Sequence, residues 1–319
     1  MRVLVTGGGG FVGQWLARAL LERGDNVDLA GLGATFTGPS ILDDAERRCT
    51  RWLELDVRNA EQVDDVVERS APELIVHLAG VSFPPDAERS PETTYDVNTT
   101  GAVRLLSAVE RRRVAGTLDP TVLVVGTGTQ YGLHDSSEMP LGETAEQRPA
   151  WTYAASKAAQ ETVALAAQRA TGARVICTRS FNHSGVGHGE QYLLPSLVAR
   201  ARRIERGEPG PLVIGNDVVR DYLHVADVVE AYLALAALGR PGETYNVASG
   251  RGLSTKQLAA DVLLRAGVRA DITTASALVR RSDIPTLIGS PAKLMRDTGW
   301  APRHTHADII DDLLNAATD

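Results

Sequence analysis

Tyr153 and Lys157 are the residues whose types and spacing most clearly could do chemistry. They lie four positions apart in the stretch Thr152–Thr171, whose pattern predicts a helix, so both side chains fall on one face. An ammonium group can reach sugar hydroxyls, and its charge lowers the pKa of a neighbouring phenol, which suits the phenol to proton transfer. The chain holds seven tyrosines and only three lysines, so we favour a catalytic pair over an ordinary surface pair.

Thr127 is the candidate third member of this group. It follows the apolar run Thr121–Val125, and doubly wound sheets bind ligands at the carboxyl ends of their strands. Its hydroxyl could hydrogen-bond a reacting oxygen beside Tyr153, with Thr129 as the competing candidate. We expect Tyr131 to pack in the core instead.

A glycine motif near the start of the chain predicts a dinucleotide site. It has the pattern GxxGxxG and stands between a predicted strand and a helix. Bare backbone there lets a pyrophosphate approach the amide N–H groups at the positive end of the helix, and the last glycine lets that helix pack closely. The predicted cofactor-binding residues of this motif are Gly7, Gly10, Phe11, Val12 and Gly13.

The second predicted strand favours NADP(H) over NAD(H). An acid at the tip of this strand would bind the ribose 2′-hydroxyl of NAD, but Asp28 is in mid-strand and the tip is Gly31. Nothing at the tip repels a 2′-phosphate, although no Arg is there to hold one. Thr35, Thr37 and Ser40 could donate hydrogen bonds to it. NAD(H) therefore remains an alternative.

Two further strand ends are predicted to line the cofactor. Asp56 and Val57 follow the third strand and suit contact with adenine, although Asp56 could also be a strand-end acid that faces water. Leu78, Ala79 and Gly80 follow the fourth strand, where small residues let the chain pass close to a cofactor.

The elements that position these residues alternate between strand and helix. This alternation predicts an α/β fold, a Rossmann-type doubly wound parallel sheet with a smaller C-terminal substrate-binding part. The predicted strands are Arg2–Val5, Asn26–Ala30, Trp52–Asp56, Leu74–Leu78, Thr121–Val125, Arg174–Thr178 and a returning Thr244–Ala248. The predicted helices are Phe11–Arg23, Glu61–Ser70, Val97–Arg113 and Thr152–Thr171.

The predicted domain boundary is a soft one. Residues 1–178, with a returning segment near 216–248, are expected to form the dinucleotide-binding domain. Residues 179–215 and 249–319 are expected to form the substrate-binding domain. The Gly-, His- and Ser-rich segment Phe181–Gln191 is expected to be a loop between them.

Composition narrows the class of protein. With 319 residues, 43% hydrophobic residues and a net charge of −7, the chain can bury a full core and has no general attraction for nucleic acid or anionic membranes. Two distant cysteines exclude a disulfide scaffold and a thiolate zinc site, and the histidines show no metal spacing. No signal peptide or membrane span is recognisable, so we expect a soluble cytoplasmic protein.

These motifs together resemble the extended short-chain dehydrogenase/reductase superfamily, also known as the NAD-dependent epimerase/dehydratase family. The resemblance covers the glycine motif, the Thr127/Tyr153/Lys157 triad and the segment Arg179–Asn182. The segments Val219–Asp227 and Arg280–Pro285 look like its GDP-mannose branch.

The resemblance implies a role for each matching residue. Tyr153 would be the acid, and Lys157 would adjust the pKa of Tyr153 and bind the cofactor ribose. Thr127 would supply the hydroxyl that orients the substrate. The substrate-binding residues that it implies are Thr127, Gly128, Thr129, Asn182, Arg220 and Arg280, of which the last three would hold the nucleotide diphosphate. The resemblance further implies a homodimer that pairs the helices Val97–Arg113 and Thr152–Thr171.

The two residues after Thr127 differ from the family pattern of dehydratases. Dehydratases of the superfamily carry an acidic pair directly after the triad hydroxyl, where this chain has Gly128 and Thr129, so dehydration is not expected. The expected activity is NAD(P)H-dependent reduction of the 4-keto group of a GDP-linked 6-deoxyhexose, which yields a rhamnose or a 6-deoxytalose configuration. The alternatives are a nucleotide-sugar 4-epimerase, a TDP-4-ketohexose reductase and a non-catalytic dinucleotide sensor.

Overall fold

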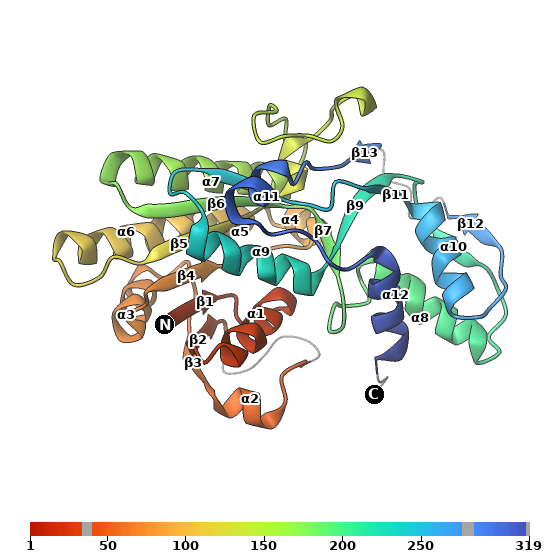
Figure 1. Ribbon diagram of the computed structural model, residues 1–319, viewed down its shortest axis with the longest axis horizontal. Helices are drawn as coiled ribbons and strands as arrows, with labels where there is room; N and C mark the ends of the chain where they lie inside the picture. Colours follow the sequence, from red (N-terminus) through yellow and green to blue (C-terminus); the bar gives the residue numbers. More distant parts are fainter. Residues whose placement is uncertain (34–39, 276–283, 317–319) are drawn as a thin grey trace.

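A seven-stranded parallel sheet forms the centre of the computed structural model, which describes residues 1–33, 40–275 and 284–316 (Figure 1). Its strand order is β10-β6-β5-β4-β1-β2-β3, and every neighbouring pair is parallel. The strands are β1 (Arg2–Thr6), β2 (Asn26–Gly31), β3 (Thr50–Glu54), β4 (Leu74–His77), β5 (Thr121–Thr127), β6 (Arg174–Ser180) and β10 (Thr244–Val247). The doubly wound α/β fold predicted from the sequence is confirmed.

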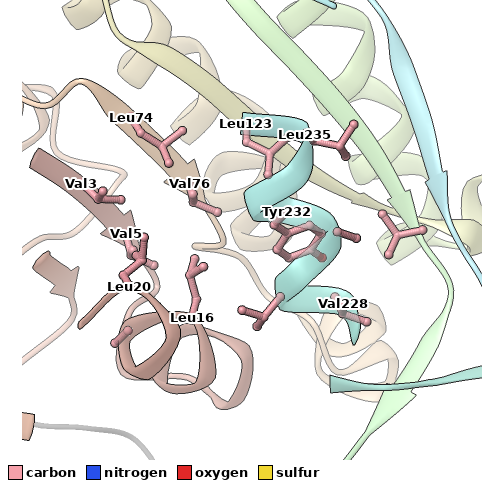
Figure 2. Packing of buried hydrophobic residues seen from close by; sticks show 14 of the residues in the cluster. Val3, Val5, Leu16, Leu20, Leu74, Val76, Leu123, Val228, Tyr232 and Leu235 are labelled. Carbon is pink, nitrogen blue, oxygen red and sulfur yellow. The ribbon is translucent and has the colours of Figure 1, made fainter. Parts of the chain in front are cut away.

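Helices cover both faces of this sheet because its strands are apolar on both sides. In β1, Val3 and Val5 point into one core and Leu4 into the other. The first core contains α1 (Phe11–Glu22), which contributes Leu16 and Leu20, and α9 (Val225–Leu238), as Figure 2 shows. The second core contains α3 (Ala60–Ser70), α6 (Gly101–Val114) and α7 (Thr152–Thr171).

The strand order reverses at β1, which pairs with β2 on one side and β4 on the other. The loops after β1 and β4 therefore leave the carboxyl edge of the sheet in opposite directions and open a crevice between them, where doubly wound folds bind ligands. The loop after β5 lies at the same edge, beside that after β4. This topology gathers the glycine motif, residues 78–80 and Thr127 at one end of the sheet.

A smaller part of the chain lies beyond this edge (Figure 1). It has a sheet of order β11-β9-β13, in which β7 also pairs with β9, and a two-stranded β12-β8 sheet. The strands are β7 (Asn182–Ser184), β8 (Leu212–Ile214), β9 (Val219–His224), β11 (Gly252–Ser254), β12 (Ile272–Thr274) and β13 (Thr286–Leu287). A separate core joins α8 (Leu193–Glu205), α10 (Thr255–Arg265) and α12 (His306–Asn315).

Short helices complete the connections. The α-helices are α2 (Asp44–Arg48), α4 (Pro84–Arg89), α5 (Pro91–Tyr95) and α11 (Ala292–Thr298). The π-helix is η1 (Asp96–Thr100), and the 3₁₀-helices are η2 (Gly128–Tyr131) and η3 (Ser136–Glu138). In the described ranges, no helix combines the length and apolar character that a bilayer crossing demands.

Three sequence predictions differ from the structure. The expected loop Phe181–Gln191 contains strand β7, because β9 supplies an edge with which Asn182–Ser184 can pair. The third strand begins at Thr50 and ends before Asp56, which lies in the following turn. The helix expected from Val97 begins as π-helix, and regular α-helix starts at Gly101. The proposed domain division stays a prediction. Leu294 and Trp300, which that division assigns to the substrate-binding domain, pack into the first core.

Candidate active site

The glycine motif forms a turn that only bare backbone can make. Gly7 has φ +71°, and a β-carbon there would lie 2.7 Å from the Ala79 nitrogen. A β-carbon on Gly13 would lie 2.6 Å from the Gly8 carbonyl oxygen, so this glycine lets α1 pack against the loop itself. Gly10 is the N-cap of α1 and offers no side-chain cap. The N–H groups of the first turn, from Phe11 onward, have no intrahelical acceptors and suit a pyrophosphate.

The segment after β4 closes the other side of the crevice. Leu78 N–H donates to Thr6 O at 3.0 Å, and Ala79 N–H donates to Thr6 Oγ1 at 3.3 Å. A β-carbon on Gly80 would lie 2.9 Å from Asn98 Oδ1 and 3.7 Å from Lys157 Nζ. Bare backbone at Gly7 and at Gly80 thus lines the two sides of the crevice and forms a cradle that fits a nicotinamide dinucleotide.

Asn98 fixes this segment and was missed by the sequence reasoning. Its Oδ1 accepts from Val81 N–H at 2.7 Å, while its Nδ2 donates to Val81 O at 3.1 Å and to Ser156 Oγ at 2.9 Å. Asn98 lies in the π-helix η1, and such turns often occur at functional sites. Nothing local in the sequence marks it, because a π-turn depends on its packing against α7.

Tyr153 and Lys157 lie on α7, and among the residues that the structure describes no carboxylate pairs with the Lys157 ammonium. Burial lowers the pKa of Lys157 to about 7, and the side chain is only 5% exposed. Burial raises the pKa of Tyr153 to about 12, while a hydrogen bond with the Thr127 side chain opposes the rise and nearby Tyr192 adds to it. The lowering of this pKa by Lys157 that the sequence predicted is therefore not found, because burial outweighs it. The phenol therefore holds its proton at neutral pH and can act as an acid.

Thr127, at the end of β5, is the hydroxyl that the structure brings to Tyr153. Its Oγ1 lies 3.1 Å from Thr129 Oγ1, which makes Thr129 a neighbour of this pair. Gly128 faces Phe181, whose ring a β-carbon there would approach to 3.0 Å. Tyr131 is buried and donates its hydroxyl hydrogen to Asn246 Oδ1 at 2.7 Å, so it packs as expected.

The residues expected to hold the nucleotide diphosphate meet at Tyr222. Asn182 on β7 is paired in register with Tyr222 on β9 and hydrogen-bonds its side chain. Arg220, also on β9, is half-buried, and its charge acts on the Tyr222 phenol, although its Nη1 donates to Val219 O at 2.9 Å. Arg280 lies outside the described residues. The structure thus brings together two of the three.

At the predicted adenosine end, Asp56 has a partner within the chain. Arg58 binds both carboxylate oxygens of Asp56, at 2.9 and 2.6 Å, and lowers the pKa of that carboxyl. Val57 is buried against Gly101. Ser40 Oγ donates to Leu42 O at 3.2 Å, and Thr35 and Thr37 lie outside the described residues. Contact of Asp56 with adenine therefore stays a prediction.

An aromatic stack joins the glycine motif to the smaller part of the chain. The Phe11 ring stacks on His188 at 4.5 Å, and His188 stacks on Tyr192 at 4.1 Å. The Tyr192 hydroxyl lies 3.5 Å from Ser82 Oγ. The sequence reasoning missed Tyr192, although its place directly before an amphipathic helix could have drawn attention to it. In the part of the chain that the structure describes, no group of His, Cys, Asp and Glu residues could hold a metal ion.

Comparisons with known proteins show which proteins this chain is similar to. The family model described as GDP-mannose 4,6 dehydratase matches residues 4–313. The chain is 32% identical to the GDP-6-deoxy-D-mannose reductase of Pseudomonas aeruginosa, over 98% of this chain and 96% of the relative. It is 28% identical to a UDP-glucose 4-epimerase of Streptococcus mutans, over 99% and 96%. A solved structure of RMD from Pseudomonas aeruginosa complexed with NADPH is similar with a TM-score of 0.81 and 29% identity, over 98% of each chain.

Proposed function

Because this chain belongs to the GDP-mannose 4,6-dehydratase family of NAD(P)-dependent nucleotide-sugar enzymes, we propose that it reduces the 4-keto group of a nucleotide-linked 6-deoxyhexose. The favoured substrate is GDP-4-dehydro-6-deoxy-D-mannose, and the product is GDP-D-rhamnose or its 4-epimer, GDP-6-deoxytalose. The observation that carries this proposal is the Thr127–Tyr153 hydrogen bond beside a buried Lys157, without a dehydratase acid.

Thr127, Tyr153 and Lys157 each have a separate role in the proposed reaction. The glycine motif and residues 78–80 would hold the dinucleotide, whose nicotinamide would supply the hydride. Thr127 hydrogen-bonds the reacting carbonyl oxygen, and Tyr153 donates its proton to that oxygen as negative charge develops there. Lys157, one helical turn along α7, hydrogen-bonds the cofactor ribose and stabilises the phenolate that Tyr153 becomes.

The family also contains dehydratases, whose activity this chain does not share under the proposal. Gly128 and Thr129 directly follow Thr127, and neither can take up or return a proton at neutral pH. Removal of water from a sugar requires such a group beside the reacting carbons. Reduction requires only the single proton that Tyr153 supplies.

NADP(H) is the proposed cofactor and a GDP-sugar the proposed substrate. No acid stands at the tip of β2 to repel a 2′-phosphate, and the similar solved structure is complexed with NADPH. Arg220 and Arg280 are suited to the diphosphate, because guanidinium groups match phosphate geometry. The relative with 32% identity is named for a GDP-sugar, which favours that nucleotide over TDP.

A homodimer through α6 and α7 is also proposed. A hollow of about 490 Å³ between these helices is lined mainly by apolar side chains, and Val103 and Val114 there are 41% and 79% exposed. A second copy would cover this surface. Sedimentation that shows only monomer at micromolar concentration would contradict the dimer.

The deciding experiment follows nicotinamide absorbance when the protein is mixed with freshly made GDP-4-dehydro-6-deoxy-D-mannose and either NADPH or NADH. The proposal predicts loss of one reduced cofactor per keto sugar, faster with NADPH. The epimerase relative makes a nucleotide-sugar 4-epimerase the second candidate. That candidate predicts tightly held NAD in the purified protein and sugar conversion without net cofactor consumption.

A further inference from the structure

A buried side-chain amide connects the strand that carries Thr127 to the helix that carries Tyr153. Gln130, in the 3₁₀-helix η2, is fully buried. Its Oε1 accepts a hydrogen bond from Thr127 N–H at 2.7 Å, and its Nε2 donates to Glu161 Oε2 at 2.9 Å. Glu161 lies on α7, about two turns beyond Tyr153 and on the same face. Hydrogen bonds thus link Thr127 to α7 at both its backbone and its side chain.

Glu161 is a fixed anchor for this connection. Arg179 donates to both of its oxygens, from Nε at 2.9 Å and from Nη2 at 2.6 Å, and both residues are only 5% exposed. Gln147 Nε2 donates to Glu161 Oε1 at 2.9 Å. Each carboxylate oxygen therefore accepts two hydrogen bonds, and charge-assisted bonds of this kind hold their geometry firmly.

The strand leaves room for the amide at Gly126. A β-carbon at this position would lie 2.4 Å from Gln130 Oε1 and 2.5 Å from Thr178 O. Only glycine therefore lets the Gln130 side chain fold back onto the end of β5. The glycine and the glutamine act as a matched pair that flanks the segment Thr127–Thr129.

We propose that Gln130 is a positioning residue, which holds the Thr127 hydroxyl at hydrogen-bonding distance from Tyr153 by binding Thr127 N–H at one end and Glu161 at the other. The claim rests on the proposed function for the reaction that these residues perform. Gln130 itself is buried behind the strand end and acts only through Thr127. Misplacement of a reacting group by about 1 Å can cost about 100-fold in rate.

The test compares Gln130→Met with the matched control Gln147→Met. Both remove a hydrogen bond to Glu161, and Gln147→Met also removes Gln147 Oε1, which accepts from Gln130 Nε2 at 3.1 Å. Only Gln130→Met removes the acceptor of Thr127 N–H. We expect Gln130→Met to lower kcat about 10- to 100-fold, with KM for the keto sugar and Kd for NADPH unchanged. Gln147→Met should keep kcat within about 3-fold, since it leaves Thr127 in place. Equal losses of kcat in the two variants would overturn the proposal.

A double-mutant cycle separates positioning from general damage. In a Thr127→Ala background, Gln130→Met should lower kcat by no more than about 2-fold further, because the residue on which it acts is already gone. A full additional loss would show that Gln130 does not act through Thr127. If Gln130→Met fails to fold, Gln130→Asn, which keeps the amide but is one methylene too short, replaces it with the same expectations.

Amide hydrogen exchange decides the claim independently of the substrate. If the wild-type protein reduces no keto sugar, the proposed function fails, but the Thr127 amide is still measurable. It should be protected in the wild type and in Gln147→Met and exchange faster in Gln130→Met. Equal protection in all three proteins would overturn the positioning role.

Discussion

Replacement of Lys157 by Met should stabilise the cofactor-free protein at neutral pH while it weakens NADPH binding. The Lys157 side chain is 5% exposed, and burial lowers its pKa from 10.5 to about 7. The charged ammonium therefore destabilises the folded state, fully so below pH 7 and progressively less as the pH rises towards 10.5. Met has a similar length and no charge, so this penalty disappears in the variant.

The magnitude follows from linkage between protonation and folding. With pKa values of about 7 in the folded and 10.5 in the unfolded state, the penalty is about 4 kcal/mol at pH 7 and about 2 kcal/mol at pH 9. For a chain of 319 residues, about 4 kcal/mol corresponds to a rise in Tm of about 6 °C. The advantage of the variant should therefore halve between these two pH values.

Urea unfolding of both proteins at pH 7 and pH 9, without cofactor, measures this difference in the free energy of unfolding. Lys256→Met is the matched control, because Lys256 is exposed on α10, and it should change the free energy by less than about 0.5 kcal/mol. A Lys157→Met protein no more stable than the wild type at pH 7, or one whose advantage is the same at both pH values, would refute the reasoning. Lys157 would then not be a buried cation.

Three further outcomes are expected. Tyr153→Phe should lower kcat by about 100-fold or more while Kd for NADPH, measured by fluorescence titration, stays the same; full turnover would exclude Tyr153 as the acid. Gly7→Ala should abolish NADPH binding. The control Gly24→Ala, at a position with a similar φ of +76° but open space around it, should bind NADPH normally, and equal NADPH affinity of the two variants would contradict the proposed cofactor cradle. Burial lowers the pKa of His77 to about 3, so the free energy of unfolding should fall as the pH drops below 6.5. Between pH 6 and pH 4, the free energy of unfolding measured with urea should fall by about 2–3 kcal/mol less in His77→Gln than in the wild type. An equal fall in both proteins would refute this.

The features that the sequence predicted correctly are those whose signals are local. These are the glycine turn before α1, the alternation of strands and helices, and the placement of Tyr153 and Lys157 on one helix, each of which depends on neighbouring residues alone. The preference for Thr127 over Thr129 could not be derived from spacing, because both lie near the end of the same strand. It became visible only when α7 was placed beside β5.

The features that were missed depend on distant parts of the chain. Asn98 acts through a π-turn and through Ser156, and Gln130 through a carboxylate on α7. Strand β7 forms because β9 offers it an edge, although its own residues favour a loop. The Arg58 side chain that binds Asp56 could be seen only once the turn after β3 was known.

The most direct test of the central claim is the fate of a deuterium label. The protein is incubated with GDP-4-dehydro-6-deoxy-D-mannose and NADPH deuterated at the transferable position of the nicotinamide, and the sugar product is examined by NMR and mass spectrometry. We predict one deuterium at C4 of a 6-deoxyhexose for each NADPH oxidised. An unlabelled sugar, or a 4-epimer formed without oxidation of NADPH, would contradict reduction as the function of this protein.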